Sequence, residues 1–244
     1  SRGLGDVYKR QVVDINLVLD SANDEYIKET LDNMAKYNKP TIIRFGAEMN
    51  IGYLGDSPTA YIKAFRKIAD MVHEYPNFAV MWSPNDNGSL DRPFGYFYPG
   101  DEYVDWFAYS QFAQGRCQAM IDLARKHGKP LFIAESTPMF QEKGVVASEL
   151  RLSNPEQANR AWSTWYKELF NTVESNPDVV KAFSYINADW PSEAMWQGDT
   201  VIFSKIDARL QINPDITVKW KEKMKTERSV SYTHLRAHET DQYL

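Results

Sequence analysis

Short apolar runs alternate with longer amphipathic segments along this chain, and this alternation constrains the fold most. Six runs rich in β-branched and aromatic residues predict buried strands, at residues 12–19, 41–45, 78–82, 104–112, 130–135 and 179–187. Helical spacing of apolar residues, helped by Pro near two helix starts, predicts helices at residues 23–37, 58–74, 118–127, 153–174 and 215–225. Strands that alternate with helices favour a parallel sheet, because a parallel connection must return to the starting end of the sheet.

The fold class expected from this pattern is α/β, of the (β/α)8 TIM-barrel type. Neither GxGxxG nor GxxxxGK[ST] follows any predicted strand, which disfavours a nucleotide-binding fold. A closed barrel of this type needs eight strands and the pattern supplies six. The barrel is therefore expected to be incomplete.

Composition excludes several classes of protein. With 28 basic and 33 acidic residues the net charge is −5, so the basic excess typical of a nucleic-acid binder is missing. No apolar run is long enough to span a membrane. The single cysteine, Cys117, excludes an internal disulfide and a multi-cysteine zinc site, and His73 and His127 are not at strand ends. We predict no cofactor, no metal, no nucleic-acid partner and no membrane partner.

The two ends of the chain differ from its body. Residues 1–11 and 229–244 continue none of the neighbouring patterns, and both resemble translated sequencing-adapter segments seen on metagenome-derived gene models. We interpret them as artefactual segments and exclude them from the fold prediction. Residues 12–228 are then expected to form one barrel fragment.

Two glutamates, Glu48 and Glu135, follow apolar strands, where the working residues of such barrels lie. A buried carboxylate without a partner costs several kcal/mol, so each needs a partner or a task. Two carboxyl groups that face one cleft can hydrolyse a glycosidic bond, one as proton donor and the other as nucleophile. The alternative is a structural ion pair, for example between Glu48 and Arg44. An aromatic content of 14%, with 7 Trp and 14 Tyr, suits a protein that stacks on sugar rings and favours the first interpretation.

Four segments, in order, resemble glycoside hydrolase family 26, which comprises β-mannanases and related β-glycanases. Residues 44–50 (RFGAEMN) are similar to the Arg-x-x-His-Glu-x-Asn motif of its fourth strand. The other three are residues 82–85 (WSPN) with 98–105, residues 129–135 and residues 184–190 (SYINADW), which resemble its fifth, seventh and eighth strands. The resemblance covers roughly residues 12–225 and implies that strands 3 to 8 are present.

This resemblance implies a retaining double displacement, with Glu135 as nucleophile and Glu48 as acid/base. The two carboxyl groups would then lie about 5–5.5 Å apart. Two departures from the family pattern are visible. Ala47 replaces the His that precedes the acid/base, and the sixth strand ends in Gln111-Phe112 rather than in an Asp and tyrosines. A hydroxyl that steadies the nucleophile is therefore expected from elsewhere, with Tyr185 as the candidate.

Substrate-binding residues are expected around these carboxylates. Flat aromatic faces complement the C–H faces of pyranose rings, and amides can bond sugar hydroxyls. The candidates are Arg44, Asn50, Tyr53, Trp82, Asn85, Gln111, Tyr185, Trp190 and Trp196.

The function favoured by the sequence is a retaining endo-β-glycanase that hydrolyses a β-mannan or β-glucan. The alternatives are a catalytically impaired carbohydrate-binding barrel, to which Ala47 gives weight, and an inactive fragment. A polysaccharide or oligosaccharide is the expected partner, and the parent protein is expected to be secreted or periplasmic because polymers are extracellular. The sequence leaves the oligomeric state open.

Overall fold

The computed structural model describes residues 15–51, 57–85, 93–113, 115–142, 145–146, 149–196 and 202–225. The terminal segments 1–11 and 229–244 lie outside the described residues. The chain divides into two compact units, which we treat separately. Unit 1 comprises Ser1–Ser110 and Ala119–Phe132, and unit 2 comprises Gln111–Gln118 and Ile133–Leu244.

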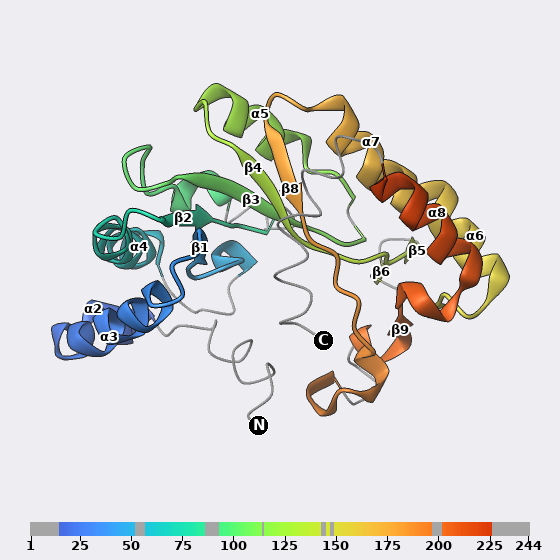
Figure 1. The fold of residues 1–244 in the computed structure, drawn as a ribbon, viewed down its shortest axis with the longest axis horizontal. Coiled ribbons are helices and arrows are strands. Elements are labelled where there is room, and N and C mark those ends of the chain that lie inside the picture. The colour runs from blue at the N-terminus through green and yellow to red at the C-terminus, as the bar shows by residue number, and fades with distance from the viewer. Residues whose placement is uncertain are drawn as a thin grey trace. The chain divides into compact units, whose positions relative to one another are not determined.

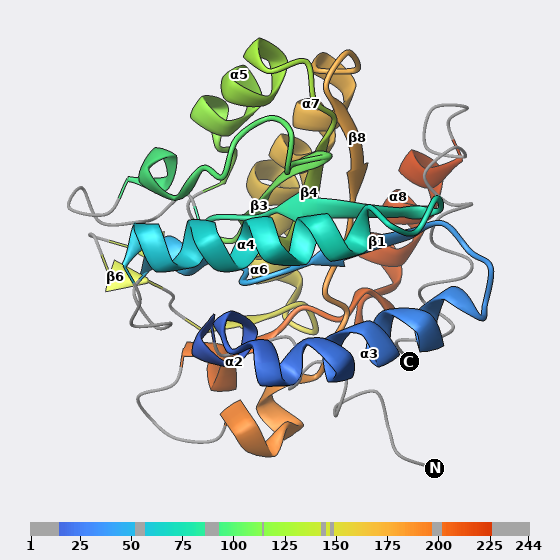
Figure 2. The same ribbon diagram turned by 90° about the vertical axis from the view of Figure 1, so that its left-hand side faces the viewer.

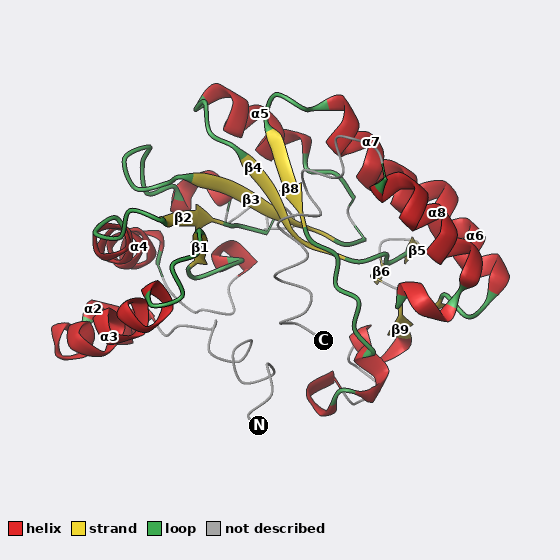
Figure 3. Cartoon of the chain, viewed as in Figure 1, coloured by secondary structure: helices red, strands yellow, loops and turns green. Residues whose placement is uncertain are grey.

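The principal sheet contains five strands in the order β1-β2-β3-β4-β8, and β4 passes from unit 1 into unit 2. Their bounds are β1 Thr41–Arg44, β2 Phe78–Trp82, β3 Trp106–Gln111, β4 Leu131–Ser136 and β8 Val180–Phe183. The pairs β1/β2 and β2/β3 are parallel, and Figures 1 and 3 show the strands with helices between them along the chain. The predicted α/β fold, of an incomplete barrel type, is confirmed. These five strands correspond to the predicted runs from residue 41 onwards.

Unit 1 contains helices as well as β1, β2 and most of β3. The helices are α2 Ile15–Leu19, α3 Asp24–Ala35, α4 Pro58–Val72 and α5 Gln118–Lys126, which begins at the boundary with unit 2. Helix α4 begins where the Ser57 side chain accepts a hydrogen bond from the Ala60 N–H, and it buries Tyr61, Phe65 and Ile68 on one face. Figure 2 shows α4 in the foreground, with α2 and α3 below it.

The first predicted strand is wrong. Residues 15–19 form helix α2, and residues 12–14 lie outside the described residues. A short apolar run fits either a strand or a buried helix, so periodicity alone could not decide. In the structure Ile15 and Val18 are buried while Leu17 is exposed, which is the spacing of one helical face. Lys67 of α4 donates to the Val18 carbonyl at 2.8 Å, so contact with α4 favours the helix.

Unit 2 also contains helices. They are α6 Pro155–Ala161, α7 Lys167–Ser175 and α8 Pro214–Met224, and a π-helical turn at Trp162–Tyr166 joins α6 to α7. Trp220 of α8 contacts Tyr166, Phe170 and Phe183, with ring centroids 5.3–6.1 Å apart. Phe170 of α7 also contacts Phe183, so α7 and α8 pack against β8 through these rings.

Further short elements were not predicted from the sequence. They are the pairs β5 Gln141–Glu142 with β6 Val145–Val146, and β7 Leu150–Arg151 with β9 Ile206–Asp207. The 3₁₀-helices are Ser21–Asn23, Met49–Ile51, Phe94–Phe97, Trp190–Ser192, Ala194–Trp196, Ile202–Lys205 and Leu210–Ile212. Two-residue strands are too short to leave a hydrophobic period in the sequence.

The turn after β1 depends on Gly46. Its φ is +54°, a region in which L side chains are strained. A Cβ at this position would also lie 2.8 Å from Cε2 of Tyr61, which is fully buried between Phe45, Phe65 and Phe97. Both the backbone and the aromatic packing of α4 therefore require glycine here.

Three glycine-to-alanine variants separate these two requirements. At Gly95 φ is ordinary and an added Cβ would meet no atom within 4 Å. At Gly128 φ is +65° and the space for a Cβ is equally open. At Gly46 φ is positive and the Tyr61 ring occupies that space. We expect Gly95→Ala to leave the urea midpoint nearly unchanged and Gly128→Ala to lose about 1–2 kcal/mol of unfolding free energy. Gly46→Ala should lose more than Gly128→Ala because Tyr61 must also move. Equal midpoints for Gly46→Ala and Gly95→Ala would contradict this description of the turn.

Candidate active site

Glu48 lies on the turn that follows β1, in a backbone conformation that is rare for a residue with a side chain. Its φ is +57°, and its N–H donates to the Ser83 carbonyl at 2.7 Å, just after β2. A left-handed non-glycine residue persists only where its surroundings determine it, and such residues are frequent at functional sites. Glu48 as a residue is half-buried.

The parallel pairing of β1 and β2 brings the segments that follow these strands close together. Thr41 pairs with Phe78 and Arg44 with Met81, a constant offset of 37 residues. Asn85 has the same separation of 37 residues from Glu48, and its side-chain amide donates to Glu48 Oε1 at 2.8 Å. The carboxyl end of a parallel pair thus brings the predicted acid/base next to a predicted sugar-binding amide.

Asn50 and Asn85 bind each other. The Asn50 Oδ1 accepts the Asn85 main-chain N–H at 2.7 Å, and the Asn50 Nδ2 donates to the Asn85 carbonyl. Both residues are buried, with 1% and 7% exposure. The two predicted sugar-binding residues therefore have protein partners, and the segment after β2 is tied to the turn after β1.

Arg44 lies at the end of β1 and contacts buried hydroxyl groups. Its Nε donates to Ser83 Oγ at 2.9 Å, and its Nη2 donates to Ser110 Oγ at 3.4 Å. Both serines have no exposed surface. The guanidinium thus links the ends of β1, β2 and β3 within unit 1, next to the segment that carries Glu48.

Trp82 corrects one expectation. Its ring has 0% exposure, packs against Phe94, Tyr98 and Phe107, and donates its indole N–H to the Phe97 carbonyl at 3.1 Å. A ring with no exposed face cannot stack on a sugar, so Trp82 belongs to the core of unit 1. The other aromatic candidate of this region, Tyr53, lies outside the described residues.

Glu135 lies in β4, in the part of this strand that belongs to unit 2, and is half-buried. The residues that follow it are tied to the segment after β8. Ser136 Oγ donates to the Ser184 carbonyl at 2.5 Å, and Thr137 Oγ1 donates to the Ile186 carbonyl at 3.1 Å. Gln111, which is fully buried, accepts the Thr137 N–H through its own carbonyl at 3.3 Å. Glu135 thus precedes a well-bonded strand end.

Tyr185 has a structural position in unit 2. Its hydroxyl donates to the Ala208 carbonyl at 2.5 Å and lies 2.6 Å from the Tyr166 hydroxyl. Its ring contacts Trp165 and Trp220, and burial raises the pKa of its hydroxyl. These contacts explain Tyr185 as a link between β8 and the helices, and they lend no support to the prediction that it steadies Glu135 or binds sugar.

Trp190 and Trp196 belong to an aromatic cluster after β8. Phe203 lies between them, with ring centroids 4.4 Å from Trp190 and 4.5 Å from Trp196, and Phe112 packs against Trp190 at 6.5 Å. Trp190 is 7% exposed, whereas Trp196 is half-buried. The accessible ring surface at this place therefore belongs to Trp196, with Trp190 as its support. Phe203 and Phe112 were not predicted as members of this cluster, because no local pattern links them to Trp190.

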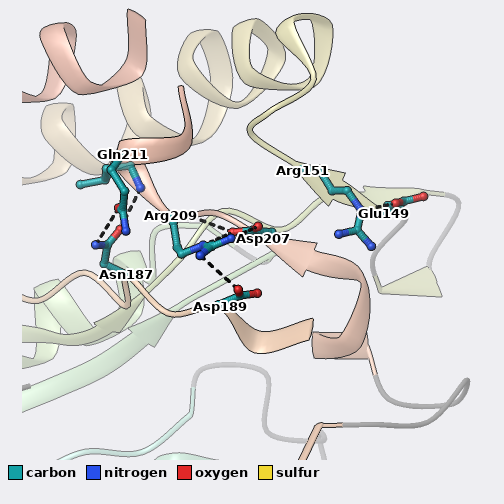
Figure 4. A network of polar contacts seen from close by, with 8 residues as sticks. Glu149, Arg151, Asn187, Asp189, Asp207, Arg209 and Gln211 are labelled. Atoms are coloured by element: carbon teal, nitrogen blue, oxygen red, sulfur yellow. Dashed lines mark hydrogen bonds and ion pairs between the residues drawn. The ribbon is translucent and has the colours of Figure 1, made fainter. Parts of the chain in front are cut away.

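A polar network holds the segment that leads to Trp190 (Figure 4). Arg209 bonds both oxygens of Asp207, at 2.8 Å and 2.7 Å, and its Nη1 lies 3.1 Å from Asp189 Oδ2. Asn187 donates to Gln211 at 3.1 Å and accepts the Leu210 N–H at 2.8 Å. Burial alone would raise the pKa of Asp207, but the hydrogen bonds and positive charge of Arg209 outweigh it and hold this pKa below its ordinary value. The sequence analysis missed this network, since Arg209 carries no motif.

Asp207→Asn should destabilise unit 2 in a pH-dependent way. A carboxyl with a lowered pKa stabilises the folded state above its ordinary pKa of 3.8, and this contribution is lost as the pH falls through the lowered value. We expect a loss of about 1.5–3 kcal/mol at pH 7, the range for hydrogen bonds to charged groups, and a smaller loss at acidic pH. Urea unfolding of Asp207→Asn and the parent chain, at pH 7 and at acidic pH, measures the loss in unfolding free energy.

Glu149→Gln is the matched control. Glu149 pairs with Arg151, but both side chains are exposed (57% and 43%), so its loss should stay below about 1 kcal/mol. Equal losses for the two variants, or a larger loss for Asp207→Asn at acidic pH than at pH 7, would contradict the role of the Arg209 network.

The residues that the structure describes contain neither a cluster of metal ligands nor a helix suited to a membrane. Among them, no group of three or more His, Cys, Asp and Glu side chains is placed to hold a metal ion. No helix in the same residues has the length and apolar character needed to cross a bilayer.

Sequence comparison relates the chain to two β-1,3-xylanases. It is 29% identical to a β-1,3-xylanase from a Vibrio species over 82% of the chain, and 27% identical to one from an Alcaligenes species over 87%. The chain spans about half the length of these curated relatives, 47% and 48%. No protein-family model matches it.

Structure comparison relates the fold to mannanases of family 26. The chain matches a GH26 β-mannanase from Bacteroides ovatus with a TM-score of 0.54 and 16% identity, covering 89% of this chain and 63% of that one. It matches the catalytic domain of a GH26 endo-β-1,4-mannanase from Bacillus sp. JAMB-750 with a TM-score of 0.50 and 21% identity, covering 74% and 53%. The chain is thus similar to β-1,3-xylanases in sequence and to family 26 glycoside hydrolases in fold, which confirms the resemblance predicted from its strand-end motifs.

Proposed function

We propose that this chain carries the catalytic residues of a retaining endo-β-glycanase, with Glu48 as acid/base and Glu135 as nucleophile. The observation that carries the proposal is Glu48 itself. A carboxyl group at the carboxyl end of a parallel strand, on a left-handed residue and bonded by a buried amide, is held in a way that packing alone does not require. Glu135 lies in the strand whose sequence resembles that of the family nucleophile.

The first step is a displacement at the anomeric carbon. A carboxylate oxygen of Glu135 forms a bond to this carbon while the bond from the carbon to the leaving oxygen breaks. The electron pair of the broken bond passes to the leaving oxygen, which takes the proton of Glu48. The products of this step are a glycosyl-enzyme ester on Glu135, an ionised Glu48 and a free sugar end.

The second step releases the sugar. Glu48 takes a proton from a water molecule as the water oxygen bonds to the anomeric carbon. The ester bond to Glu135 breaks, its electron pair returns to the carboxylate, and both glutamates regain their starting states. Two inversions retain the configuration, and the cycle needs no cofactor.

β-1,3-Xylan is the first substrate to test. The names of the two relatives at 29% and 27% identity support it, whereas the likeness to mannanases extends to the fold. β-Mannan and β-glucan, favoured by the sequence motifs, are the next candidates. Because such polymers do not enter cells, we propose a secreted or periplasmic location for the parent protein.

Hydrolysis of a polymer panel tests the proposal. We expect the chain to release reducing sugar from β-1,3-xylan or, failing that, from mannan, mixed-linkage glucan or laminarin. Glu48→Gln and Glu135→Gln keep the size of each side chain but remove its acid/base or nucleophilic chemistry, so each should reduce release by at least about 10²-fold. Glu74→Gln, at an exposed glutamate of unit 1, should retain full activity.

The outcome also distinguishes an enzyme from a binding protein. The chain could instead release no sugar from any polymer, but bind one polymer with equal affinity before and after Glu135→Gln. This result would replace the proposed enzyme function by that of a carbohydrate-binding barrel. Ala47 would then be the first residue to restore to His.

The stereochemistry of the product tests the mechanism separately. A double displacement requires the first product to keep the β configuration at the new reducing end. Proton NMR during the first minutes of hydrolysis should therefore show the β anomer before the α anomer appears by mutarotation. Initial appearance of the α anomer would contradict Glu135 as nucleophile and indicate a single displacement by water.

A further inference from the structure

We infer that Asn85 is a positioning residue for the acid/base: its amide holds Glu48 Oε1, so that Oε2 is the oxygen that carries the catalytic proton. This inference rests on the proposed function. It also changes the role predicted for Asn85 from the sequence, which was to bind a sugar hydroxyl.

The assignment of the two oxygens follows from the chemistry of the amide. The Asn85 Nδ2 lies 2.8 Å from Glu48 Oε1, and an amide NH₂ can donate a hydrogen bond but cannot accept one. Oε1 must therefore be the acceptor both when Glu48 is ionised and when it is protonated. The proton that Glu48 gives to the leaving oxygen, and later takes from water, then resides on Oε2.

Asn85 is itself held in place by Asn50. The side chain of Asn50 bonds the main-chain N–H and C=O of Asn85, which leaves the Asn85 side chain directed at Glu48. Because these bonds go to the main chain of Asn85, they do not depend on its side chain. A substitution at Asn85 therefore removes the contact with Glu48 and preserves the contacts that order the segment after β2.

Glu48 is thus held at two points by one short segment. Ser83 accepts its main-chain N–H at 2.7 Å, and Asn85 bonds its carboxyl group. The residue before Glu48 is Ala47, which has no polar side chain, where the family has His. In this chain the Asn85 amide supplies a polar contact that orients the carboxyl group.

Leaving-group dependence separates a positioning role from a sugar-binding or structural one. A 2,4-dinitrophenolate leaves without protonation, whereas the sugar oxygen of an oligosaccharide requires the proton of Glu48. We would compare kcat/KM for a 2,4-dinitrophenyl β-glycoside and an oligosaccharide of the same sugar. The variants are Asn85→Ala, Asn85→Asp and the control Asn77→Ala. Asn85→Asp keeps the shape of the side chain but places a second carboxylate next to Oε1 of Glu48. Asn77 makes an exposed amide-to-amide bond with Asn38 in the same unit.

We expect Asn85→Ala to lower kcat/KM on the oligosaccharide about 10–100-fold, as a displaced catalytic group does, with a several-fold smaller effect on the dinitrophenyl glycoside. Asn85→Asp should lower the oligosaccharide value further at neutral pH, and Asn77→Ala should match the parent on both substrates. Urea midpoints of all variants are measured in parallel, and the inference requires Asn85→Ala and Asn77→Ala to unfold at similar urea concentrations.

Two kinds of result would overturn the inference. Equal losses on both substrates, or a rise in KM with kcat unchanged, would return Asn85 to substrate binding. If instead the parent chain hydrolyses neither substrate, the proposed function fails and this inference fails with it. Activity of the parent is thus the measurement that tells the two failures apart.

Discussion

The parallel pairing of β1 with β2 is the constraint on which the Glu48 site depends. This pairing brings the carboxyl ends of the two strands together, where Asn85 bonds the carboxyl group of Glu48 and the Ser83 carbonyl accepts its main-chain N–H. Without this register the left-handed conformation of Glu48 would have no partner to maintain it. The strand pairing therefore brings together the two segments whose contacts hold this carboxyl group.

Support for this register comes from the layer behind the strands. Phe45, which follows β1, contacts Tyr61 and Phe65 of α4, and Gly46 leaves room for the Tyr61 ring. Arg44 connects the same strand end to Ser83 and Ser110. In the segment Arg44–Glu48, the first three residues contact α4 or the neighbouring strands. Glu48, the residue proposed to react, follows them. This arrangement explains why a strained turn is tolerated at this place.

In unit 2 a different kind of interaction orders the candidate binding surface. Trp190 is packed against Phe203, while Asp189, directly before it, is held by Arg209. Apolar packing sets the place of the ring, and a charged network sets the path of the main chain. Asp207, only 12% exposed, is the partner that keeps Arg209 in position. The half-buried Trp196 packs against Trp190 and Phe203, which these interactions hold in place.

The strands from residue 41 onwards, the helices between them and the carboxylates near the strand ends could be predicted from local pattern, because periodicity and strand ends are local properties. The prediction from sequence went no further than these local features. It failed at residues 15–19, where contact with α4 selects a helix, and at Trp82, whose burial depends on Phe94, Tyr98 and Phe107. Three further findings required the folded chain: Asn50 and Asn85 bind protein groups, the Tyr185 hydroxyl bonds Tyr166 and Ala208, and Arg209 holds Asp189. Each of these contacts joins residues distant in sequence, and no local pattern encodes which of several polar partners a side chain meets once the strands have paired.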